Sequence, residues 1–90
     1  MNRTIITVIG KDRVGIIAKI CTYLAENSIN VLDINQSIVQ GFFNMIMIVD
    51  AQNSEKDFAV LNSEIEKISE DLGVKIKMQH EDIFNVMHRI

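Results

Sequence analysis

The sequence has little positive charge and no long hydrophobic run, and each shortage excludes a class of protein. Nine lysines and arginines against twelve aspartates and glutamates give a net charge of −3. The chain therefore has no basic field to attract nucleic-acid phosphates. The apolar stretch between Arg3 and Lys11 is too short for a signal peptide or a membrane span. We expect a cytoplasmic protein that binds neither nucleic acid nor membranes.

Side chains for covalent catalysis or metal binding are also scarce. The lone Cys21 cannot form an internal disulfide, and it lies in an apolar helical pattern typical of a buried thiol. His80 and His88 have no second pair of metal ligands at zinc-type spacing. Gly10 and Gly15 are spaced like the start of a P-loop, but its Gly-Lys-Ser/Thr ending is missing. We expect no enzyme activity, no metal and no cofactor.

Apolar residues, in contrast, are abundant for a chain of this size. Ninety residues fit one small domain, because so short a chain supports a single core. Of these residues 48% are hydrophobic and only 23% are charged. One small monomer cannot easily hide so much apolar surface, so we expect a partner surface.

Hydrophobic periodicity predicts four strands and two helices in the order βαββαβ, followed by a short C-terminal helix. We expect Asp12 to be the N-cap residue of the first helix. We expect Ser54 and Asp57 to form a capping box at the start of the second helix, which ends at Gly73. The predicted strands are 3–9, 30–39, 42–49 and 74–79, and the predicted helices are 14–27, 58–72 and 81–90.

Right-handed crossovers then give a ferredoxin-like α+β sandwich with an antiparallel sheet in the order 4-1-3-2. The third strand is apolar at nearly every position, which predicts that both of its faces are covered. Two helices cover only one face. We expect the 81–90 helix, a second subunit, or both to cover the other.

The turn GKDRVGII, residues 10–17, has the chemistry of a ligand site. Free amides at a helix start attract a carboxylate or phosphate, Asp12 can accept an ammonium group, and Arg13 can add a charged clamp. Gly15 leaves room for a ligand to approach the backbone. The alternative is that Asp12 only caps the helix, Gly15 only packs and Arg13 is only solvated.

This turn, with the following helix and the segment SINVLDINQ, resembles the ACT domain, a βαββαβ module attached to many amino-acid-regulated metabolic enzymes. The resemblance covers about residues 3–79, and the chain is similar to free-standing single-domain bacterial ACT proteins. It implies an ACT-like domain over residues 1–80 and a helical extension over 81–90.

In the family, a D-x-x-G turn and an Asn opening the second strand meet at a subunit interface, where an amino acid binds. The resemblance thus implies a regulatory homodimer with a small-molecule ligand and a separate protein target. Val14 stands where many members have proline, and Gly10 where some amino-acid-binding members have histidine. The implied ligand-binding residues are Asp12, Arg13, Val14, Gly15, Ile16 and Asn30.

Two other functions fit the same element order. RNA-recognition domains share it, but the first strand here has no ring for base stacking and the domain is acidic. An interaction or dimerisation module without a small-molecule ligand is the remaining alternative, with the apolar sheet face and edge strands docking another protein.

Overall fold

A computed structural model describes residues 3–11 and 14–80 and confirms the predicted element order. The 81–90 helix lies outside the described residues. The elements are β1 (Arg3–Lys11), α1 (Ile16–Glu26), β2 (Asn30–Val39), β3 (Phe42–Asp50), α2 (Phe58–Leu72) and β4 (Lys75–His80).

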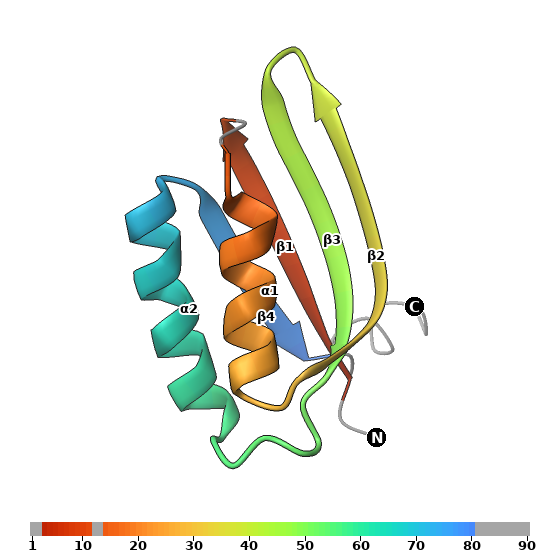
Figure 1. Cartoon of the computed structure of the whole chain (residues 1–90), viewed down its shortest axis with the longest axis vertical. Coiled ribbons are helices and arrows are strands. Elements are labelled where there is room, and N and C mark those ends of the chain that lie inside the picture. Colours follow the sequence, from red (N-terminus) through yellow and green to blue (C-terminus); the bar gives the residue numbers. More distant parts are fainter. Residues whose placement is uncertain (1–2, 12–13, 81–90) are drawn as a thin grey trace, which may run out of the picture.

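The strands form one antiparallel sheet in the predicted order, β2-β3-β1-β4. Both helices lie on the same face of this sheet, and β2 is the edge strand farther from them (Figure 1). Gln40 and Gly41 both have positive φ, which closes the tight hairpin between β2 and β3. The molecule is therefore a sheet layer with helices on one side.

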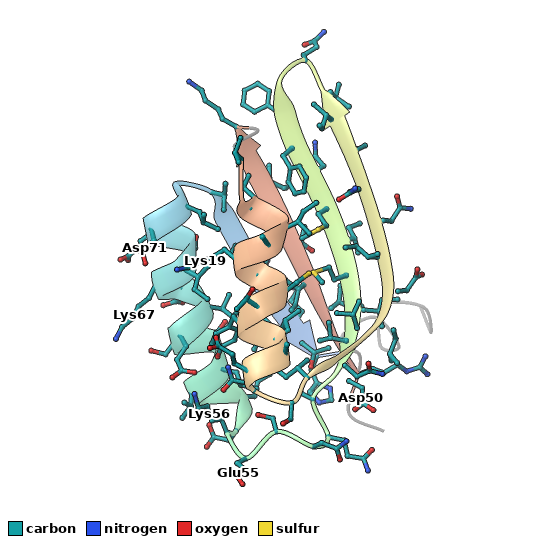
Figure 2. All side chains as sticks on the ribbon, viewed as in Figure 1. Lys19, Asp50, Glu55, Lys56, Lys67 and Asp71 are labelled. Carbon is teal, nitrogen blue, oxygen red and sulfur yellow. The ribbon has the colours of Figure 1, made fainter. Side chains whose placement is uncertain are left out.

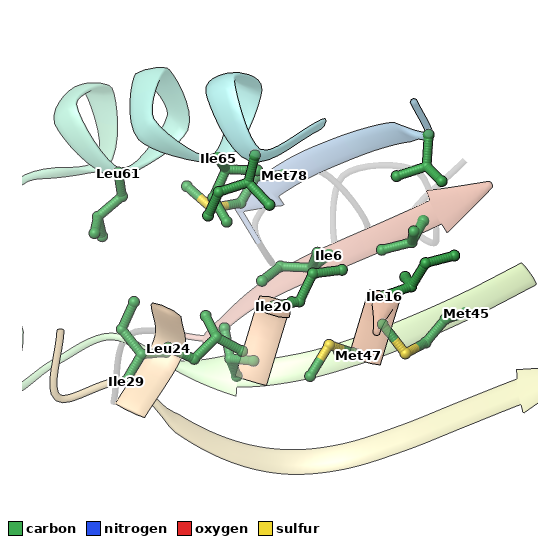
Figure 3. Close-up of a cluster of buried hydrophobic side chains, with 14 of the residues drawn as sticks. Ile6, Ile16, Ile20, Leu24, Ile29, Met45, Met47, Leu61, Ile65 and Met78 are labelled. Atoms are coloured by element: carbon green, nitrogen blue, oxygen red, sulfur yellow. The ribbon is translucent and has the colours of Figure 1, made fainter. Parts of the chain in front are cut away.

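The core lies between the helices and the middle of the sheet. Ile6 of β1 pairs with Met47 of β3 and Met78 of β4, and all three side chains face the helices and are buried. Ile20 of α1 and Ile65 of α2 pack onto them (Figure 3). Because side chains alternate along a strand, this register assigns every second residue of β1 and β3 to the core.

The helix starts differ from the prediction. Asp57 alone caps α2, with its side chain accepting a hydrogen bond from the Val60 amide at 3.0 Å, so the expected Ser54 cap is wrong. The residue at the cap of α1 is Gly15, with φ +92° and no side-chain hydrogen bond, rather than Asp12. Val14 is consequently exposed and outside the helix. Gly73 is confirmed as the left-handed cap that ends α2.

The sheet face away from the helices is uncovered within the part of the chain described here. Phe42 and Ile46 of β3 are 51% and 53% exposed there, and Ile9 of β1 is similarly exposed. That the 81–90 helix, a second subunit, or both cover this face of β3 stays a prediction.

Glycine is required at position 10 by close packing between β1 and the start of β4. A Cβ atom on Gly10 would lie 2.7 Å from Cγ1 of Val74, whose side chain is buried. That separation is too short for two carbon atoms, so any larger residue must displace Val74.

A cluster of three polar side chains joins the two helices. The Tyr23 hydroxyl of α1 donates to Oε1 of Glu64 on α2 at 2.7 Å, and Lys56 Nζ contacts Oε1 and Oε2 at 2.9 and 3.1 Å. Hydrogen bonding from Lys56, then from Tyr23, lowers the pKa of Glu64. Burial and the bond to Glu64 raise the pKa of Tyr23 above its ordinary value. The cluster therefore favours ionised Glu64 and neutral Tyr23.

Met47→Glu tests the buried face of the sheet. Because Met47 is 0% exposed, a carboxylate there loses its hydration, and we expect a loss of about 3 kcal/mol or more in the free energy of unfolding. Urea denaturation measures this loss. Ile46→Glu, on the open face, is the matched control and should cost far less. A near-native midpoint for Met47→Glu would contradict the burial, and an equal loss for Ile46→Glu would show that the open face is covered in solution.

Glu64→Gln tests the polar cluster through pH. Since folding lowers the pKa of Glu64, its contribution to stability is present above the ordinary carboxyl pKa and is lost as pH falls through the folded value. Urea midpoints of the wild type should therefore decline more steeply in acid than those of Glu64→Gln. Glu66→Gln is the control, because Glu66 lies nearby on α2 but makes no contact with the cluster within the described residues. Parallel pH profiles for all three proteins would refute the cluster's role.

Candidate functional site

The start of α1 is the centre of the candidate site. Gly15 has open space where a Cβ would stand, so a ligand can approach its backbone. The first hydrogen bond of the helix runs from the Lys19 amide to the Gly15 carbonyl at 2.9 Å, and no side chain among residues 3–11 and 14–80 caps this end. The amides of residues 16–18 thus have no partner within the helix. Together with the helix dipole, they form an anion-binding end.

The six predicted site residues do not all gather at this turn. Val14 and Gly15 lie there, whereas Asp12 and Arg13 lie outside the described residues. Ile16 is 2% exposed, because its side chain belongs to the core; only its backbone amide can serve a ligand. Ile16 therefore contributes a donor rather than an apolar contact.

Asn30 lies at the opposite end of the subunit. Lys11, just before the turn, pairs with Phe42, while Asn30 pairs with Asp50 at the far end of β3. These two ends of β3 are eight residues apart, or about 26 Å at the rise of a strand. Figure 1 shows the start of α1 and the start of β2 toward opposite ends of the sheet. Within one subunit, Gly15 and Asn30 cannot contact the same small ligand.

A groove of about 340 Å³ lies beside the first turn of α1, between it and the distal part of β2. Its walls are mainly apolar, with an amide and a hydroxyl among them. The sequence analysis did not include these residues, because only the antiparallel pairing of β2 with β3 brings them near the turn. Assigning the β2–β3 register from the sequence, residue by residue, would have identified them. The lining residues are Ile17, Gln36, Ser37, Ile38 and Phe43.

The described part of the chain holds no second cluster of charged or metal-binding side chains. Charged side chains such as Lys19, Lys67 and Asp71 are spread over the surface (Figure 2), and residues 3–11 and 14–80 hold no group of three potential metal ligands. Cys21 is a half-buried free thiol. Among the described helices, none is long and apolar enough to cross a membrane.

Comparisons with known proteins agree with this architecture. The ACT-domain profile matches residues 2–79. UPF0237 proteins of Bifidobacterium longum and Methanocaldococcus jannaschii are each 54% identical over 90 residues, covering 100% of both chains. The relatives include archaeal as well as bacterial proteins.

Solved structures share the fold. An ACT domain protein from Streptococcus pneumoniae superposes with a TM-score of 0.82 at 37% identity, covering 92% of this chain and 93% of that one. A formyltetrahydrofolate deformylase from Pseudomonas syringae gives a TM-score of 0.83 at 21% identity, over 89% of this chain but 28% of that chain, and so shares the fold alone. With the βαββαβ sheet order and the match over residues 2–79, these relations show that the chain belongs to the ACT-domain family, in its UPF0237 group of small single-domain proteins.

Proposed function

We propose that this protein is a regulatory module that binds a small molecule, an amino acid, as a cytoplasmic homodimer. The start of α1, which no described side chain caps and which is open at Gly15, is the observation that carries the proposal. Its free amides would bind the ligand carboxylate, and Asp12 and Arg13 would contact the remaining polar groups. The adjoining groove, with Ile17 and Ile38 in its walls, would take the side chain of the ligand.

The dimer would form along β2. This edge strand is exposed at every position and carries apolar side chains such as Leu32 and Ile34 that no helix covers within the described residues. An unpaired edge of this kind readily adds another strand. Antiparallel pairing about a twofold axis at the strand centre would place Asn30 of the partner subunit opposite Val39, near the start of α1. The site would then be completed by two subunits.

A second candidate function is a protein interaction module with no small-molecule ligand. It is favoured by the open sheet face, where Ile9, Phe42 and Ile46 are each about half exposed. Contiguous apolar surface on a small domain marks an interaction site more often than chance. On this alternative, the start of α1 stays empty and the sheet face carries the function.

Isothermal titration of the twenty amino acids tests the ligand site. We expect saturable heat from at least one of them, abolished by Asp12→Ala. Gly15→Ala should weaken binding about tenfold, because alanine in left-handed backbone costs 1–2 kcal/mol and shifts the amides. No heat from any amino acid, with the dimer intact, would leave the interaction module as the function.

Sedimentation at micromolar concentration tests the dimer. We expect a species of twice the 10.2 kDa chain mass. Ile34→Lys would bring two like charges near the twofold axis and shift the equilibrium toward monomer by at least tenfold. Val60→Lys, a similarly exposed position on α2, is the matched control. A monomer alone for the wild type, or equal association of both variants, would contradict pairing through β2.

A further inference from the structure

A second cavity lies at the other end of α1, separate from the proposed amino-acid site. It encloses about 260 Å³ between the last turns of α1, the first turn of α2 and the sheet. Leu24 and Ile29 form one wall, Leu61 of α2 forms another, and Met78 of β4 lies on the floor (Figure 3). The wall beneath the helices is therefore apolar, whereas Gln52, Ser54, Lys56 and Asp57 line the side of the loop before α2.

One polar group lies deep in this apolar wall. Thr4 of β1 lines the cavity and is only 2% exposed. Its side chain faces the helices, since Thr4 alternates with Ile5 and shares its face with Ile6. Within residues 3–11 and 14–80 its hydroxyl makes no side-chain hydrogen bond. The hydroxyl is therefore available to hydrogen-bond a molecule that enters the cavity.

The charged side chains that line the cavity, Lys56 and Asp57, belong to the loop before α2 and not to the buried wall. Lys56 and Tyr23 line the cavity, and both are bonded to Glu64 on the outside. Asp57 also lines it, but its carboxylate is used by the Val60 amide at the start of α2. A charged group bonded to Thr4 would lose its hydration against a wall that offers it no counter-charge. The cavity therefore favours a neutral molecule.

We propose that this cavity is a second binding site, for an uncharged, mainly apolar molecule with one hydrogen-bonding group, of about the size of benzyl alcohol or indole. The apolar body would fill the space between Leu24 and Leu61, and its polar group would bond the Thr4 hydroxyl. The site does not depend on the amino-acid site proposed above.

Methyl NMR of the full chain, titrated with benzyl alcohol, tests this site. Saturable shifts are expected for methyl groups of Leu24, Ile29 and Leu61, and none for Ile38 at the groove beside the start of α1. Benzoate and benzylamine, which carry the same ring with a charge, should bind at least about tenfold more weakly. An absence of saturable shifts, or tighter binding of either charged compound, would overturn the proposal. Shifts in Ile38 alone would place the binding in the other groove and equally overturn it.

Two substitutions then locate the ligand. Thr4→Val keeps the volume but removes the hydroxyl and should weaken benzyl alcohol about three- to tenfold, whereas Thr4→Ser, which keeps the hydroxyl, should restore most of the affinity. Ala51→Phe, at the cavity wall, should block binding while circular dichroism confirms folding. Unchanged affinity in Thr4→Val or in folded Ala51→Phe would overturn the assignment.

Discussion

The structure depends on one constraint: two helices cover only one face of the sheet and leave the edge strand β2 exposed. This one-sided cover decides which side chains are buried. Met45 and Met47 of β3 are enclosed, while Phe42 and Ile46 of the same strand are half exposed on the other side. The edge strand β2 is exposed at all ten positions. The core, the groove and the surface open to partners all result from this one-sided cover.

The two ends of α1 differ in how their polar groups are satisfied. At its start, no side chain of the described residues caps the backbone amides, and the adjoining groove is mainly apolar. At its end, Tyr23 is bonded to Glu64 of α2, and Leu24 closes a cavity against the sheet. An anion fits the first environment and a neutral molecule the second. The two proposed sites thus lie at opposite ends of one helix and share no lining side chain.

Sequence patterns predict the elements well but not the backbone at their starts. The order of the sheet and the bounds of β2 are confirmed, because strand alternation and crossover handedness follow directly from side-chain type and order. Val14 fits helical spacing, yet the left-handed Gly15 excludes it from α1, and spacing carries no information on φ. Thr4 resembles any β-branched strand residue; its place in a cavity depends on the gap between two helices, which only the tertiary structure defines.

The contact between Gly10 and Val74 restricts how this site can change during evolution. Position 10 is the first residue of the candidate turn, near the end of β1, whereas Val74 lies beyond α2, far along the chain. A histidine at position 10, as in some ACT domains, would require a smaller residue at 74 and a shift of the junction between α2 and β4. The two positions should therefore vary together among relatives, because the side chain at 74 limits the size of the residue that position 10 can hold.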